Sequence, residues 1–157
     1  MRRLTKNRGF EIVKGYENKN INIPVRKTKL SAGYDIEAAE DIVIPSFKVG
    51  TKPTLIKTGL KCYMQNDEYL MLVNRSSNPV KRGLVLANSV GIIDADYYNN
   101  PDNDGHLMYA FYNYSKEDII IKKGDTIGQA IFMKYLLVDN DSSNGERKGG
   151  FGSTDKE

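Results

Sequence analysis

Residues 54–73 read TLIKTGLKCYMQNDEYLMLV, in which short apolar runs alternate with polar and turn-forming residues. The apolar runs are rich in β-branched and aromatic side chains, which is typical of β-strands separated by turns. The same pattern recurs along the chain. It predicts strands at Phe10–Val13, Ile42–Ile44, Thr54–Tyr63, Tyr69–Val73, Leu84–Ala87, Leu107–Tyr112, Ile119–Ile121 and Ile127–Tyr135.

No stretch keeps a helical spacing of apolar residues for more than a turn or two. Many short strands with irregular connections predict an all-β protein, an antiparallel β-barrel or sandwich of the jelly-roll type. Such a protein has exposed sheet edges that need to be covered, and an oligomer is one way to cover them.

The chain has 157 residues, which is the usual size of one domain. After Val138 the composition changes to DNDSSNG, which contains nothing that can form a core. We therefore expect a single β domain over residues 1–138 and a flexible C-terminal arm over residues 139–157.

Composition excludes several classes of protein. Cys62 and His106 are the only residues of their kinds, so an intramolecular disulfide, a tetrahedral zinc site and a Ser-His-Asp triad are not expected. The chain has no run of about 18 apolar residues and no signal-peptide pattern, which predicts a cytoplasmic protein without a membrane partner. Nine Lys or Arg lie in the first thirty residues, but without a groove-binding motif they indicate a solvated basic face rather than a nucleic-acid partner.

The segment GGFGST, Gly149–Thr154, lies at the end of the expected arm. Its glycines allow backbone N–H groups to approach an anion, and its hydroxyls, with the preceding Arg147 and Lys148, add donors and charge. Phe151 offers a ring that can stack on a base. The segment therefore reads either as a phosphate cradle or as a Gly-rich tail, and it matches neither a P-loop nor a dinucleotide-binding fingerprint.

Two further segments carry chemistry. In NRSSNP, Asn74–Pro79, a predicted strand ends at an arginine whose planar fork suits phosphate oxygens, although such turns are also common in structural roles. In NSVGIIDADY, Asn88–Tyr97, Asp94 emerges from an apolar strand and is a candidate general base. The turn at residues 99–105 begins like a calcium-binding loop but lacks the glutamate that would complete it.

In this combination and order, the segments resemble the five motifs of the trimeric dUTPase family. The resemblance covers roughly residues 22–155, and the matching segments are AGYD at 32–35, RSS at 75–77, GIIDADY at 91–97, GDTIGQ at 124–129 and GGFGST at 149–154.

The resemblance implies an enzyme that hydrolyses dUTP to dUMP and pyrophosphate. It implies a jelly-roll protomer in a homotrimer, with active sites shared between chains and the arm crossing to a neighbour. Asp94 would activate water for in-line attack on the α-phosphate. Mg²⁺ would be held mainly through the substrate phosphates and waters, without direct protein ligands. The activity would limit uracil incorporation into DNA and supply dUMP for dTMP synthesis.

The resemblance also assigns the substrate contacts. Backbone groups near Asn88 and Met108 would read uracil, and Tyr97 would pack under the deoxyribose and exclude UTP. Phe151 would close over the base. The full set of substrate-binding residues is Arg75, Ser76, Ser77, Asn88, Ile92, Ile93, Tyr97, Met108, Gln129, Arg147, Phe151, Gly152, Ser153 and Thr154, with Asp35 and Lys148 in supporting roles.

The chain departs from the family pattern at two informative places. Gly128 stands where alanine is usual, and Arg147 lies one residue closer to Phe151 than expected, so that Lys148 is a second candidate for the terminal phosphate. Two rival functions remain: a dCTP deaminase, which would need a glutamate base, and a nucleotide-controlled regulatory protein with a protein partner.

Overall fold

The computed structural model describes residues 5–150 and residue 152, and their regular structure is almost entirely β-strand. The strands pair antiparallel, as predicted for an antiparallel protein of the jelly-roll type. The strands are β1 (Gly9–Ile12), β2 (Tyr34–Glu37), β3 (Ile42–Ile44), β4 (Thr54–Lys57), β5 (Leu60–Tyr63), β6 (Glu68–Asn74), β7 (Leu84–Leu86), β8 (Gly91–Asp94), β9 (Met108–Asn113), β10 (Ile119–Ile121) and β11 (Thr126–Lys134).

The described residues form two helical segments of a single turn each, η1 (Asn78–Arg82) and η2 (Ala95–Tyr97). Neither has the length or apolar character needed to cross a membrane.

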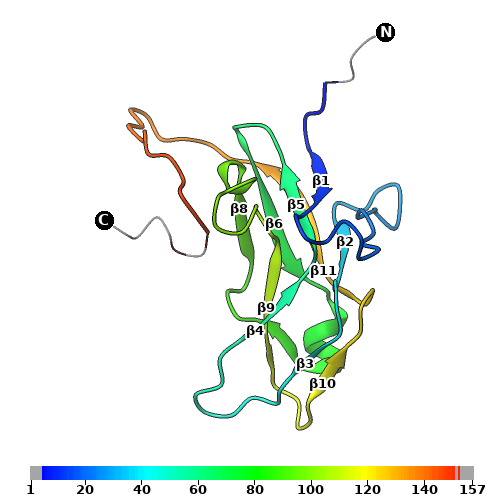
Figure 1. Ribbon diagram of the computed structural model, residues 1–157. Coiled ribbons are helices and arrows are strands. Elements are labelled where there is room, and N and C mark those ends of the chain that lie inside the picture. Colours follow the sequence, from blue (N-terminus) through cyan, green and yellow to red (C-terminus); the bar gives the residue numbers. More distant parts are fainter. Residues whose placement is uncertain (1–4, 151, 153–157) are drawn as a thin grey trace.

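Two larger sheets form the body of the molecule. One has the strand order β2-β11-β6-β8 and the other β4-β9-β7, and the pairs β1-β5 and β10-β3 extend them at opposite ends (Figure 1). Inward-facing side chains from both sheets form one hydrophobic cluster, because alternate residues of a strand point to the same face. Its fully buried members include Ile36, Ile56, Leu70, Leu84, Tyr109, Phe111, Ile127 and Ala130.

The prediction of a single strand over Thr54–Tyr63 was wrong. The segment forms two strands with different partners, since β4 pairs with β9 and β5 pairs with β1. Gly59 separates them with a φ of +70°, a conformation that glycine adopts without strain. The hydroxyl of Thr58 donates to the carbonyl of Leu107 at 2.7 Å, which turns the chain from one sheet to the other.

The list of predicted strands also lacked β2. This strand reads YDIE, and two acidic residues in four make a weak strand signal. It forms because it pairs with β11, an interaction that no local pattern reveals.

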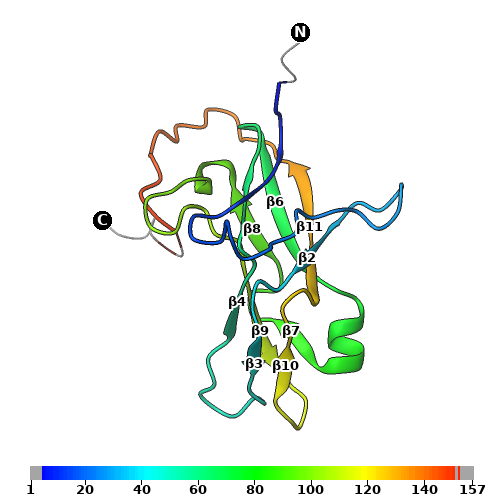
Figure 2. The same cartoon turned by 45° about the vertical axis from the view of Figure 1, so that its right-hand side comes forward.

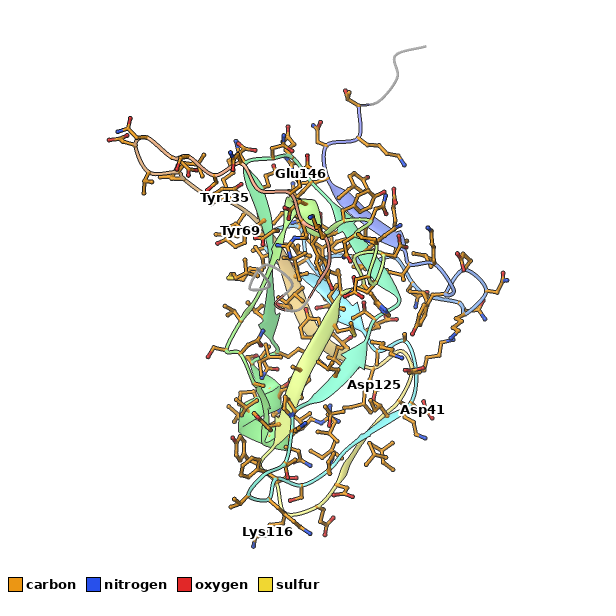
Figure 3. The ribbon with its side chains drawn as sticks, turned by 60° about the vertical axis from the view of Figure 1, so that its left-hand side comes forward. Asp41, Tyr69, Lys116, Asp125, Tyr135 and Glu146 are labelled. Atoms are coloured by element: carbon orange, nitrogen blue, oxygen red, sulfur yellow. The ribbon has the colours of Figure 1, made fainter. Side chains whose placement is uncertain are left out.

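The chain after β11 crosses the end of the four-stranded sheet and returns beside β8 (Figures 1 and 2). Tyr135, just after β11, lies with its ring centroid 6.3 Å from that of Tyr69 on β6. Figure 3 shows these two side chains near Glu146 of the arm, with Lys116 at the opposite end of the molecule. The arm therefore meets the body of the protein at the end where β8 finishes.

A close contact between two strands explains one departure from the family pattern. A Cβ atom on Gly128 would lie inside contact distance of Tyr109 Cε1, and 2.8 Å from both Tyr109 Cζ and the carbonyl oxygen of Val73. The Tyr109 ring cannot move aside readily, because it is 1% exposed and its hydroxyl donates to the Gln129 carbonyl at 2.6 Å. This chain thus requires glycine at position 128.

We expect Gly128→Ala to destabilise the fold by about 1–3 kcal/mol, the usual cost of forcing an extra carbon into a packed core. Thermal and urea denaturation would measure the change. Gly145→Ala is the matched control, because nothing lies within 4 Å of its Cβ position. Equal stability of the two variants would contradict this account of Gly128.

Candidate active site

Strand β8 carries the predicted base Asp94 to the surface of the four-stranded sheet. Asp94 lies opposite Tyr69 of β6, and Ile92 and Asp94 are exposed while Ile93 between them is half-buried. The backbone of Asp94 is extended, with φ −76° and ψ 155°, and η2 begins immediately after it. Its side chain is 56% exposed and points away from the core. The carboxylate therefore stands at a corner where it can meet a ligand.

A pocket of about 250 Å³ opens beside Asp94. Its lining includes residues from the turn before β8, from β8, from the start of β9 and from the arm. The predicted site residues that line it are Asn88, Ile92, Ile93, Asp94, Tyr97, Met108, Arg147 and Gly152. Pockets for whole drug-sized ligands begin at about 300 Å³, so this one suits a nucleoside-sized group. The predicted base-and-sugar residues thus come together in one place.

Tyr97 forms part of the pocket wall and is held firmly. Its side chain is largely buried, which raises the pKa of the phenol. Its hydroxyl donates to the carbonyl of His106 at 2.9 Å and accepts from the side-chain amide of Asn103 at 2.8 Å. A buried phenol with both hydrogen bonds satisfied presents a stable flat surface to a ligand.

Arg147 links the arm to the pocket. Its Nη2 donates to Asp94 Oδ2 at 2.6 Å and its Nε to Asp96 Oδ1 at 2.7 Å. Its Cζ lies 5.9 Å from the centre of the Tyr97 ring. The Asp96 hydrogen bond is the main reason that the pKa of Arg147 is raised. In this single chain, the described part of the arm folds back on its own pocket, and the crossing to a neighbour stays a prediction.

A second group of predicted residues lies at the other end of the same sheet. Gln129 donates to Asp35 Oδ1 at 3.3 Å, and Lys27 Nζ lies 3.7 Å from Asp35 Oδ2. Arg75 donates to the carbonyl of Thr126 at 3.1 Å. Arg75, Lys27 and the Gln129 amide supply donors that suit phosphate oxygens, and the Asp35 carboxylate orients two of them. Ser76 is exposed and Ser77 is the N-cap of η1 beside it.

The two groups do not meet within one chain. Asp94 is opposite Tyr69, whereas Arg75 follows six residues later, just past the end of β6. At about 3.3 Å per residue this separates them by about 20 Å. One protomer therefore brings Arg147 to its own Asp94, but not Arg75 or the group around Asp35 and Gln129.

A larger hollow of about 640 Å³ lies on the other side of Asp94. Its lining residues include three carboxylates and no Lys or Arg. They are Asn66, Asp94, Ala95, Asp96, Tyr135, Leu137, Asp141 and Ser143. Two of these carboxylates, Asp94 and Asp96, are ion-paired with Arg147. If Arg147 turned to a polyphosphate, the hollow would be left acidic and unfavourable for an anion.

The donor groups of the described residues limit how a metal ion could bind. Within residues 5–150 and 152, no cluster of three or more His, Cys, Asp or Glu can hold a metal ion. Mg²⁺ usually keeps several waters and binds through one or two carboxylates together with substrate phosphates. Binding through substrate phosphates and waters needs no closed protein cage, and Asp94 and Asp96 are both ion-paired with Arg147.

The remaining predicted site residues are Phe151, Ser153, Thr154 and Lys148. Phe151, Ser153 and Thr154 lie outside the described residues. Lys148 is exposed. Arg147, the other candidate for the terminal phosphate, is the residue that contacts the carboxylates of Asp94 and Asp96 beside the pocket.

Three residues at the two groups were not predicted from the sequence: Lys27, Asp96 and Asn103. Asp96 lies within the same motif as Asp94, but its contact with Arg147 joins positions 51 residues apart. Lys27 and Asn103 belong to polar loops without a local signal. Only the tertiary contacts identify them.

Comparisons with known proteins agree with this geometry. The family model of dUTPases matches residues 19–155. A deoxyuridine 5'-triphosphate nucleotidohydrolase of Lactococcus lactis is 55% identical over 149 residues, covering 94% of this chain and 97% of that protein. The enzyme of the same name from Saccharomyces cerevisiae is 31% identical over 138 residues, covering 84% and 86%.

Solved structures of dUTPases are also similar to this chain. The dUTPase from Streptococcus mutans superimposes with a TM-score of 0.78 at 44% identity, covering 84% of this chain and 99% of that one. The dUTPase from phage phi11 of S. aureus shares the fold, with a TM-score of 0.70 at 20% identity over 89% of this chain and 97% of that one.

Proposed function

Since this chain belongs to the dUTPase family and hydrolyses dUTP to dUMP, we propose that a water molecule activated by Asp94 attacks the α-phosphorus in line. The water oxygen bonds to phosphorus while the bond to the bridging oxygen breaks, and pyrophosphate leaves with that electron pair. The water proton passes to the Asp94 carboxylate.

The observation that carries the proposal is the exposed carboxylate of Asp94 at the rim of a nucleoside-sized pocket. Arg147 donates to Asp94 at 2.6 Å, which holds the carboxylate at the rim of the pocket. When the triphosphate arrives, Arg147 exchanges its carboxylate partners for phosphate oxygens. The exchange frees Asp94 to accept a proton.

Uracil fits between the turn at Asn88 and the start of β9 at Met108, both of which line the pocket. Backbone donors and acceptors there read the fixed pattern of the uracil edge, and the narrow space leaves no room for the methyl group of thymine. The deoxyribose packs on Tyr97, where a 2'-hydroxyl would collide with the ring. Ile92 and Ile93 form the apolar wall.

The triphosphate is held by residues that stand far from Asp94 in one chain, which supports a homotrimer with shared sites. A neighbouring chain supplies the group containing Asp35 and Gln129, and the acidic hollow beside Asp94 makes a path of the phosphates in that direction unfavourable. When bound with the substrate, Mg²⁺ offsets the charge that develops on pyrophosphate. The phosphate contacts proposed for this chain are Arg75, Ser76, Ser77, Gln129, Arg147 and Lys148.

We assign residues 1–138 to the β domain and residues 139–157 to an arm that closes over the bound nucleotide. Closure expels water from the site and places the ring of Phe151 over the base, with Gly152, Ser153 and Thr154 around it. In the cytoplasm this activity limits uracil incorporation into DNA and supplies dUMP for dTMP synthesis.

A pyrophosphate-release assay with dUTP, dCTP, dTTP and UTP tests the function. We expect kcat/KM for dUTP to exceed the other values by about 100-fold or more, because each analogue adds a group that collides or leaves a polar group unpaired. Removal of Mg²⁺ with a chelator should lower the rate. Ammonia release from dCTP would favour a deaminase, and nucleotide binding without turnover would favour a regulatory protein.

Replacing the base tests the mechanism. Asp94→Asn should bind dUTP but lose about 100- to 10,000-fold in kcat, the usual contribution of a general base. Asp96→Asn is the matched variant, because it also removes the charge of a carboxylate paired with Arg147, at a position that does not line the pocket. It should lose only a few-fold in rate, as roughly expected for one exposed hydrogen bond. A similar loss in both variants would assign the effect to Arg147 instead of to proton transfer.

Mixing two inactive chains tests the shared site. Arg75→Ala and Asp94→Asn chains, each nearly inactive alone, are refolded together in equal amounts. If each site takes Arg75 from one chain and Asp94 from the next, about a quarter of the sites regain both residues in a closed ring. Recovery of about a quarter of the wild-type activity is expected. No recovery in a mixture shown by mass to be trimeric would place both residues in the same chain's site.

A further inference from the structure

The loop that follows Tyr97 wraps closely around that residue. Asn100, which is 5% exposed, donates from Nδ2 to the carbonyl of Tyr97 at 2.8 Å. Its Oδ1 accepts from the backbone N–H groups of Asp102 and Asn103 at 3.1 Å each. Gly105 approaches so closely that a Cβ atom there would lie 2.9 Å from the Tyr97 carbonyl oxygen. The loop is therefore an ordered support and not a loose turn tip.

Ion pairing ties the same loop to the body of the protein. Lys61 of β5 contacts Asn99 Oδ1 at 2.5 Å and Asp104 Oδ2 at 3.0 Å, and the Lys61 side chain is 10% exposed. Asp104 also accepts from the backbone N–H of Lys14 at 3.0 Å. These contacts hold the loop at a set distance from Tyr97.

Within this loop, the amide of Asn103 has one defined orientation. Its Oδ1 accepts from Asn100 Nδ2 at 2.8 Å and from the backbone N–H of Gly105 at 3.1 Å. Both partners are donors, so the oxygen must face them and the NH₂ group must face away. That NH₂ group lies 2.8 Å from the hydroxyl of Tyr97.

The Tyr97 hydroxyl thus has a donor on one side and an acceptor on the other. It accepts from Asn103 and donates to the His106 carbonyl at 2.9 Å. Both partners bind the hydroxyl at one end of the ring, so together with the packing of the buried ring they restrict how it can tilt.

The arm meets the pocket at this same place. A Cβ atom on Gly150 would lie 3.0 Å from Tyr97 Cε2 and 3.1 Å from Asn103 Nδ2. Asn103 therefore stands where the loop, the ring and the arm come together.

We propose that Asn103 is a positioning residue that sets the tilt of the Tyr97 ring and thereby the discrimination between deoxyribose and ribose. The inference rests on the proposed function, because it takes the Tyr97 ring as the surface under the sugar. Asn103 itself does not line the pocket, so its effect passes through Tyr97. A ring free to tilt would make room for a 2'-hydroxyl.

The test compares kcat/KM for dUTP and UTP in variants of position 103. Asn103→Ala should reduce the dUTP-to-UTP ratio by roughly three- to tenfold, the effect of one neutral hydrogen bond. Asn103→Asp is the second variant, because it keeps the Oδ1 contacts within the loop and removes the donor to Tyr97. It should reduce the ratio similarly while leaving the melting temperature near that of the wild type.

Asp102→Ala is the matched control, since Asp102 lies in the same loop, is exposed, and has no side-chain hydrogen bond or ion pair among the interactions of the described residues. Its ratio should equal that of the wild type. A double-mutant cycle gives the sharpest readout: in a Tyr97→Phe background, Asn103→Ala should change the ratio no further, because the hydroxyl through which it acts is gone.

An unchanged ratio in both Asn103 variants, or an equal further loss in the Tyr97→Phe background, would overturn the inference. Either result is distinct from failure of the proposed function, in which the wild-type chain itself would not prefer dUTP to UTP.

Discussion

The antiparallel pairing of β8 with β6 is the constraint on which the site depends. This register sets Asp94 opposite Tyr69, at the corner where the sheet ends, and turns Ile92 and the carboxylate to the same exposed face. A shift of one residue would turn Asp94 toward the core. The pocket, the ion pairs with the arm and the position of Tyr97 all follow from it.

The same sheet sets the distance between Arg75 and Asp94. Strand β6 carries Arg75 just past one end and faces Asp94 near the other, so the distance between the two groups is set by the length of the strand. No side-chain movement spans that length. The separation of the anion-binding group from the base is therefore a property of the rigid scaffold, which is why we propose that the site is completed by another copy of the chain.

Much of the fold could be predicted because the residue types in its strands and turns are typical of β-structure. Runs such as Ile119–Ile121 are short, β-branched and bounded by turn residues, and the structure has a strand at those residues. The prediction failed where long-range contacts decide: Gly59 and Thr58 divide one apolar run between two sheets, and β2 forms only because β11 pairs with it. Glycine at position 128 is unusual for the family, and the reason for it is the close contact with Tyr109, a residue from another sheet.

The sequence by itself determined the β class of the scaffold and the family, because strand periodicity and the order of motifs can be read along the chain, and the family resemblance supplied the candidate side chains of the site. Tertiary structure alone decided that Asn88, Asp94, Tyr97 and Met108 share a pocket, that Arg147 reaches Asp94, and that Arg75 does not. It also revealed the support of Tyr97 by Asn103. These relations depend on sheet register and loop closure, which join residues distant in the chain and leave no trace in its local pattern.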